Sequence, residues 1–429
     1  MRKISRLLLQ RWKLNTSMTG YLLVCLLSVL MSGPIRAEQP LTYHVTFRAE
    51  FSQADSLAKV SIHIKQPRRI ARRLSFNAPP DRYRLSPAEE GSERAIRMGD
   101  QVIWQPGVNG DVLNMLVRID QTKGDAHDAL AQPVGFIMRL GDLFPSASVR
   151  TLKGAYSISH VELTGPAGWS FESRYGALNS ALTLPRHGRN FTRPTGWLIG
   201  GELSTRRAII ADTRVAVSSL TGEGARHLDL LAFLRWTLPQ VNEVTGGIPE
   251  RLLVVVGGNG MWRGALSGPD SIYLHKDRPM ISGNGTSTLL HEMMHVRGLH
   301  SAEDADWIVE GLAEFYSLDL LHRSGAISAR RLQRSFENLS EWADAQQGRL
   351  RNPSRGADTA RATLLFRALD AEMNRAGHSL DAVTRALLHR SEISTATLQQ
   401  EVTGLLGRSS QVLRQELSRY GAPVQAQTP

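Results

Sequence analysis

The stretch that decides the fold is His291-Glu292-Met293-Met294-His295, followed twelve residues later by Trp307-Ile308-Val309-Glu310-Gly311-Leu312-Ala313-Glu314-Phe315. Histidines four residues apart lie on one face of a helix, so both imidazoles can bind one Zn²⁺ while Glu292 points at a water on the metal. A second helix with a carboxylate can supply a third ligand and leave one tetrahedral position open. The two stretches therefore predict a catalytic zinc site on a pair of helices.

The flanking residues predict where these two helices begin and end. The Gly/Ser/Thr/Asn cluster at 282–288 suits a loop and a helix cap, and Gly298 suits the end of the first helix. Ser301 and the acidic residues after it resemble a capping box, and apolar residues recur with helical spacing from Ala302 to about Arg323. The alternative is a coincidental HExxH on an ordinary amphipathic helix whose histidines bind no metal.

The first 37 residues have the composition of a targeting segment. They hold six basic and no acidic side chains, with an eleven-residue apolar run from Tyr21 to Met31. That run is shorter than the roughly 20 residues that span a bilayer. We expect a signal peptide at 1–37, cleavage near Ala37 and a periplasmic or secreted chain with no stable membrane span. An uncleaved membrane anchor is the alternative.

Charge and cysteine content narrow the function classes. Six of the eleven net positive charges lie within the first 37 residues, so the remaining chain is only moderately basic. No interleaving of arginine and aromatic residues suggests nucleic-acid binding, and we expect no such partner. The single cysteine, Cys25, lies in the targeting segment, so the mature chain has no disulfide and must rely on its core.

The chain predicts an α+β protein in several parts. A β-sandwich-like N-terminal domain is expected at 38–185, where short segments alternate apolar and polar residues between turn-prone groups. His44, His63 and His160 lie on such segments and are expected on the solvent face rather than in a second metal site.

The catalytic domain is expected at 186–325, with a buried strand at 251–256 and an edge strand around Ile272 to His275 ahead of the HExxH helix. Such an edge can pair with an extended peptide. A helical subdomain is expected at 326–420, with helices at about 327–349, 357–376, 379–391 and 396–420, before a flexible tail at 421–429.

The HExxH stretch together with the W-x-x-E-G-x-A stretch resembles the gluzincins, the thermolysin and aminopeptidase N clan of zinc peptidases. The segment from Thr363 to Val383 is similar to the glycyl-aminopeptidase branch, and the resemblance covers about 185–400. It implies a thermolysin-like catalytic domain, peptide-bond hydrolysis and a peptide or protein substrate.

The same resemblance implies roles for individual residues. His291, His295 and Glu310 fall on the zinc ligands, Glu292 on the general base, and Glu314 on an acid that supports a ligand. The aminopeptidase N spacing would instead put the third ligand at Glu314, whereas the local motif puts it at Glu310. We predict Glu310, because interhelix turns tolerate deletion and the glycine after the ligand suits close helix packing.

Three features depart from the family pattern. Arg263 to Pro269 replaces the signature whose glutamate holds a free substrate amine, so strict aminopeptidase activity is not expected. The tyrosine that binds the oxyanion is missing near 357–361, where Arg361 is either a substitute or a solvent-facing residue. No PDZ-like domain follows the helices. The alternative function is therefore a catalytically weak or inactive peptidase-fold protein that binds zinc and peptides.

Overall fold

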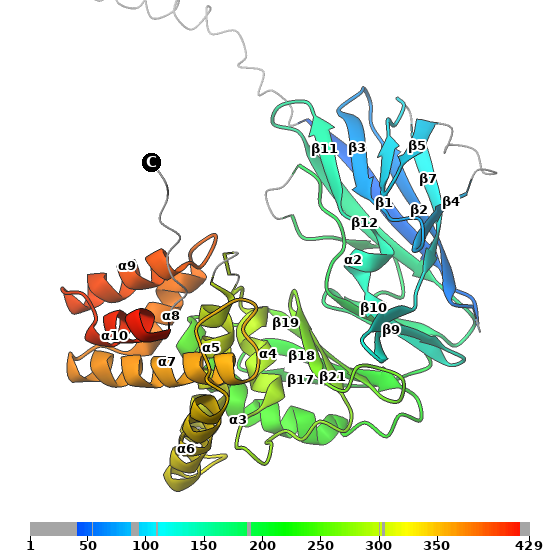
Figure 1. The fold of residues 1–429 in the computed structure, drawn as a ribbon. Helices are drawn as coiled ribbons and strands as arrows, with labels where there is room; N and C mark the ends of the chain where they lie inside the picture. Colours follow the sequence, from blue (N-terminus) through cyan, green and yellow to red (C-terminus); the bar gives the residue numbers. More distant parts are fainter. Residues whose placement is uncertain are drawn as a thin grey trace, which may run out of the picture. The chain divides into compact units, whose positions relative to one another are not determined.

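The computed structural model describes residues 41–53, 55–86, 94–108, 110–186, 190–299, 301–302 and 305–420. The signal peptide expected at 1–37 and the tail expected at 421–429 lie outside these residues. The expected α+β class is confirmed: several sheets precede a helical C-terminal region (Figure 1). Within the described residues, no helix is long and apolar enough to cross a membrane.

Three sheets form the N-terminal part. The first has the order β15 (Leu182–Thr183), β12 (Tyr156–Thr164), β1 (Thr42–Glu50), β2 (Leu57–Lys65), β7 (Asp111–Arg118), β4 (Tyr83–Leu85). The second has the order β11 (Ala147–Thr151), β3 (Ala71–Asn77), β6 (Gln101–Trp104), β5 (Ala95–Met98). The third has the order β14 (Gly176–Ala177), β13 (Ser170–Ser173), β16 (Trp197–Gly201), β10 (Gly135–Arg139), β9 (Ala126–Gln132), β8 (Gln121–Lys123), with the short helix α2 (Leu140–Leu143) after β10. Alternation in the sequence accounts for these strands, since buried residues recur at every second position of β2.

A fourth, five-stranded sheet positions the HExxH helix. Its order is β17 (Leu203–Ile210), β18 (Thr213–Leu220), β19 (Arg251–Gly257), β21 (Ser271–His275), β20 (Ala265–Gly268). The expected edge strand at 272–275 is therefore wrong: β21 is an inner strand, and β20 pairs antiparallel with it to form the edge. A two-residue hairpin loop, Pro269-Asp270, allows this pairing.

The two faces of this sheet bury different partners. Val215, Val217 and Val254 face the core shared with the helices, whereas Leu253 and Val255 face a smaller core that contains Trp197 and Ile199 of β16. Because β16 also pairs with β10 and β13, residues 197–201 connect the N-terminal sheets to the five-stranded sheet. The domain boundaries at 185/186 and 325/326 remain predictions.

Eight helices among the described residues complete this part of the fold: α3 (His227–Thr245), α4 (Thr288–Val296), α5 (Asp306–Arg323), α6 (Ala329–Ala345), α7 (Ala357–Arg375), α8 (Leu380–Leu388), α9 (Thr395–Leu406) and α10 (Gln411–Tyr420). The single helix expected at 396–420 is wrong, because Gly407 ends α9 in the left-handed conformation at φ 66°. Buried Glu372 of α7 then accepts hydrogen bonds from Ser410 and from the backbone N–H groups of Gln411 and Val412 at the start of α10.

The expected capping box at Ser301 is also wrong. Ser301 forms an isolated bridge with Ile393, and the backbone N–H of Ala302 donates to the Ile393 carbonyl oxygen at 2.7 Å. These two residues are therefore held in extended backbone, and α5 begins at Asp306 with Ala305 as an N-cap that makes no side-chain hydrogen bond.

Candidate metal centre

Helix α4 presents its two histidines and Glu292 on one partly exposed face. Ser287 caps the helix by accepting a hydrogen bond from the backbone N–H of Leu290, as the Gly/Ser/Thr/Asn cluster predicts. Met293 and Met294 are fully buried in the helical core. Because one side of α4 is fixed by this core, the face with His291, Glu292 and His295 lines a cavity.

The structure brings His291, His295 and Glu310 together. The Nε2 atoms of the two histidines lie 3.2 Å apart. Oε2 of Glu310 lies 3.3 Å from Nε2 of His291, and Oε1 of Glu310 lies 3.4 Å from Nε2 of His295. Among the described residues, these three make the one group of histidine, cysteine or acidic side chains whose ligand atoms all lie within 4.8 Å of one another.

These separations fit a zinc ion. Ligand atoms about 2.0–2.1 Å from a tetrahedral Zn²⁺ are separated from one another by roughly 3.3–3.4 Å. The histidine nitrogens lie 3.2 Å apart, close to that spacing, and one Glu310 oxygen lies 3.3 or 3.4 Å from each of them. Two imidazole nitrogens and a carboxylate are also a donor set that zinc prefers.

Glu314 lies on the other side of the His291 ring. Its Oε2 is 3.1 Å from Nδ1 of His291, and the Ser317 hydroxyl donates to the same carboxylate oxygen at 3.4 Å. A carboxylate that accepts the Nδ1–H proton fixes the tautomer that leaves Nε2 free to bind a metal. Glu310 and Glu314, four residues apart on α5, therefore contact opposite nitrogens of one imidazole.

The electrostatics of the site favour a positive charge among these side chains. Burial opposes a charge on His291, but the Glu310 and Glu314 carboxylates outweigh it and raise the pKa of His291 to about 10. Burial and the neighbouring His291 charge lower the pKa of His295. Burial acts to raise the pKa of Glu310, but the two histidines lower it overall. The two carboxylates therefore favour a positive charge beside them, as a bound metal ion would supply.

Gly311 allows α5 to approach α7 closely beside Glu310. A Cβ atom on Gly311 would lie 2.6 Å from Cβ of Ala362 and 3.0 Å from its backbone carbonyl carbon. Only glycine fits this contact without movement of a helix. The glycine after the carboxylate is therefore explained by helix packing.

The cavity at this centre has a volume of about 580 Å³. One wall is the edge strand β20 with its hairpin loop, and the other is α4 with Glu310 of α5. Asp270 in the loop has a positive φ of 44°, uncommon for a residue other than glycine. Arg174 of the loop after β13 donates to the Asp270 carboxylate.

Sequence reasoning did not identify Asp270 or Arg174 as part of this region. They are 96 positions apart, and no local pattern indicates their pairing. Arg361, the suggested substitute for the missing tyrosine, does not line the cavity. It donates to Asp344 and lies over the ring of Tyr420 at 4.2 Å. His44 and His160 stack on the β1–β12 face with ring centroids 6.4 Å apart, outside the metal group.

Solved structures share this fold. An aminopeptidase N family protein from Idiomarina loihiensis matches with a TM-score of 0.56 at 14% identity, covering 88% of this chain and 73% of the other. An M1 zinc metallopeptidase from Deinococcus radiodurans matches with a TM-score of 0.55 at 16% identity, covering 90% and 94%. No protein-family model and no curated protein matches the sequence. The similarity is therefore one of fold, shared with an aminopeptidase N family protein and an M1 zinc metallopeptidase.

Proposed function

We propose that this chain is a periplasmic or secreted zinc-dependent peptidase that hydrolyses peptide bonds, with zinc held by His291, His295 and Glu310. The observation that carries the proposal is the convergence of these three side chains, whose ligand atoms all lie within 4.8 Å of one another, beside an open cavity. The fold similarity to zinc metallopeptidases supports it. The expected glycyl-aminopeptidase relationship is a finer proposal that rests on the 363–383 segment alone.

Besides holding the metal, the chain's own residues perform two tasks in this mechanism. When bound, zinc would polarise the peptide carbonyl and lower the pKa of water. Glu292 lines the cavity beside the histidines and takes a proton from the water that attacks the carbonyl carbon, then passes that proton to the leaving amine nitrogen. Glu314 holds Nδ1–H of His291 and so keeps its Nε2 atom directed at the metal position.

The free edge of β20 suits an extended substrate. Ala265–Gly268 pairs with β21 on one side only, which leaves backbone groups along the other side for main-chain hydrogen bonds. No carboxylate lies on this strand to bind a substrate amine, and Ser267 contributes a neutral hydroxyl to the cavity. We therefore propose that cleavage is not restricted to the N-terminal residue of the substrate.

The decisive experiment uses the purified mature protein with a library of N-acetylated peptides, read by mass spectrometry. Cleavage of blocked peptides that stops with chelator and returns with added zinc is the expected result. Glu292→Gln should lower the rate by about 10²–10⁴-fold while zinc remains bound. If only free-amine peptides are cut, the proposed selectivity is wrong.

The alternative is a zinc-binding protein of this fold with weak or no hydrolysis. The observation in its favour is that Arg361 is engaged with Asp344 and that no tyrosine lines the described cavity to stabilise the oxyanion. Stoichiometric zinc with peptide binding, but no cleavage above the Glu292→Gln background, would establish this alternative.

A further inference from the structure

A second cavity of about 610 Å³ lies against the five-stranded sheet, where β18 and β19 begin and β17 ends. The β13–β14 hairpin forms its opposite side. The residues that line it are all different from those that line the metal cavity. It therefore belongs to no step of the proposed hydrolysis.

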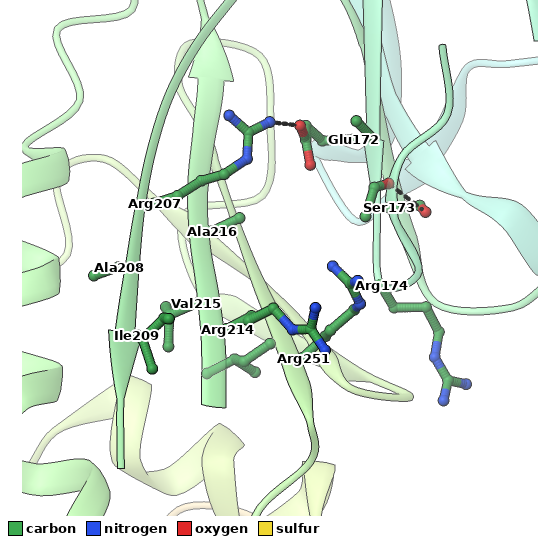
Figure 2. Close-up of a pocket in the computed structure, with 13 residues that line it drawn as sticks. Glu172, Ser173, Arg174, Arg207, Ala208, Ile209, Arg214, Val215, Ala216 and Arg251 are labelled. Carbon is green, nitrogen blue, oxygen red and sulfur yellow. Dashed lines mark hydrogen bonds and ion pairs between the residues drawn. The ribbon is translucent and has the colours of Figure 1, made fainter. Parts of the chain in front are cut away.

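Arginines dominate the polar lining of this second cavity. Arg174, Arg207, Arg214 and Arg251 contribute to it, whereas Glu172 is its one acidic residue (Figure 2). Buried Glu172 accepts a hydrogen bond from Arg207, and Arg174 is paired with Asp270. These two arginines are therefore already neutralised.

Arg214 and Arg251 are the two remaining arginines of this cavity, and they are the candidates for binding an anion. Among the described residues, the Arg214 guanidinium forms an ion pair with Glu250 alone; both side chains are more than half exposed, at 53% and 73%, so the pair stabilises little. The Arg251 side chain makes no hydrogen bond or ion pair with any residue that the structure describes, although its backbone belongs to the β18–β19 ladder. Figure 2 shows both arginine side chains among the residues that line the cavity, and their Cα atoms are paired on neighbouring strands.

The strand register forces these two charges together. Arg214 and Arg251 are Cα partners on the parallel strands β18 and β19, so their side chains leave the same face of the sheet about 4.8 Å apart at the backbone. Like charges directly opposite each other destabilise a sheet. An anion bound between the guanidinium groups would remove this repulsion and could accept hydrogen bonds from both.

An apolar wall stands beside the arginine pair. Ile209 is the Cα partner of Arg214 on the other side, so it lies on the same face, and it is 74% exposed. Ala216 extends this apolar surface from β18. A small inorganic anion would leave the wall uncovered, whereas an anion joined to an apolar group would contact both parts.

We propose that this cavity binds an organic carboxylate, with the carboxylate between Arg214 and Arg251 and its apolar group on Ile209. Two sources share this chemistry: a free amphiphilic acid and the C-terminal carboxylate of a peptide that ends in an apolar residue. Guanidinium groups favour a carboxylate over a neutral amide because two charge-assisted hydrogen bonds can form.

The test is calorimetric titration of the zinc-loaded protein with 4-phenylbutyrate and N-acetyl-Ala-Phe, each compared with its own amide. The acids should bind at least about tenfold more tightly than the amides, and more weakly as salt rises. Tighter binding of the acetylated dipeptide would assign the site to peptide C-termini, whereas tighter binding of 4-phenylbutyrate would assign it to free acids.

Two matched pairs of variants separate this site from the metal centre. Arg251→Gln should weaken acid binding at least about tenfold, whereas Arg235→Gln, an exposed arginine on α3, should not change it. Ile209→Ala should weaken it about threefold, unlike Leu228→Ala, which removes another exposed apolar side chain, on α3. Removal of Arg251 also removes a like-charge contact, so the variant should fold. Acid binding that is unchanged in Arg251→Gln, or equal for acid and amide, would overturn the proposal.

Discussion

Substitution of Gly311 by alanine tests whether close packing of α5 on α7 holds Glu310 in place. In an unobstructed helix, alanine is favoured over glycine by about 0.8–1.0 kcal/mol. Here the added methyl would lie 2.6 Å from Cβ of Ala362 and 3.0 Å from a backbone carbon of the same residue. Whether Gly311→Ala stabilises or destabilises the protein therefore depends on whether the gain in helix propensity or the steric overlap with Ala362 is larger.

Steric overlap should be the larger contribution. Non-bonded carbon atoms are normally separated by about 3.5–4.0 Å, so the helices must move apart by roughly 1 Å. Overpacking of this kind costs about 1–3 kcal/mol, and a backbone neighbour cannot relax by a rotamer change. After the gain in helix propensity, we expect Gly311→Ala to lower the free energy of unfolding by up to about 2 kcal/mol. Zinc affinity should also fall, because Glu310 is the adjacent residue.

The assay is urea unfolding of the zinc-free protein, followed by metal titration. Gly404→Ala in α9 is the matched control, because a Cβ there meets nothing within 4 Å. It should stabilise the protein by up to about 1 kcal/mol. Adding Ala362→Gly to Gly311→Ala should restore part of the stability, since the Cβ contact disappears while the backbone contact remains. A Gly311→Ala protein as stabilised as Gly404→Ala, with unchanged zinc affinity, would refute this account.

Three further predictions address the metal, the fold and the N-terminus. Glu310→Gln should abolish tight zinc binding, whereas Glu314→Gln should weaken it by about 10–100-fold. Metal analysis of both purified proteins measures this. If only the Glu314→Gln protein loses zinc, Glu314 is the ligand and Glu310 is not. Burial acts to raise the pKa of Glu372, but its hydrogen bonds lower it to about 2, so its ionised form stabilises the fold above about pH 4.5 and this contribution is lost as the pH falls toward 2. Glu372→Gln should therefore cost about 2–3 kcal/mol at pH 7 by urea unfolding, with a smaller difference at pH 3, and exposed Glu392→Gln should cost nothing measurable. Intact-mass measurement of the exported protein should show a chain that begins close to Glu38; retention of Met1 would favour the membrane anchor.

Local patterns predicted much of the architecture because their signals are short-range. Ser287 and the histidine spacing define α4 within a few residues, and its observed bounds are Thr288–Val296. The α+β class follows from alternation in the first half and helical periodicity in the second. Helical periodicity on both sides of Gly407 predicts one helix, but a glycine near a helix end often adopts the left-handed conformation and here ends α9.

Pairing between distant segments could not be read in the same way. The position of β20 outside β21 depends on which strands pair in the folded chain. The sequence of an apolar segment does not indicate whether the strand lies inside a sheet or at its edge. The pairing of Arg174 with Asp270 and the register of Arg214 with Arg251 likewise depend on sheet order. The missed features are therefore those that depend on strand order and on pairing between segments.

The choice between Glu310 and Glu314 is a case in which distance along the chain and position in space give different answers. A third ligand must reach the point that both histidine Nε2 atoms face. The Glu310 carboxylate does so, with one oxygen near each nitrogen at 3.3 and 3.4 Å. Glu314 contacts Nδ1 of His291, on the far side of the same ring, so it could replace Glu310 only if that imidazole turned over. Such a turn would direct Nε2 of His291 away from His295 and separate the two histidine ligands. The geometry therefore favours Glu310 as the ligand and gives Glu314 the task of orienting His291.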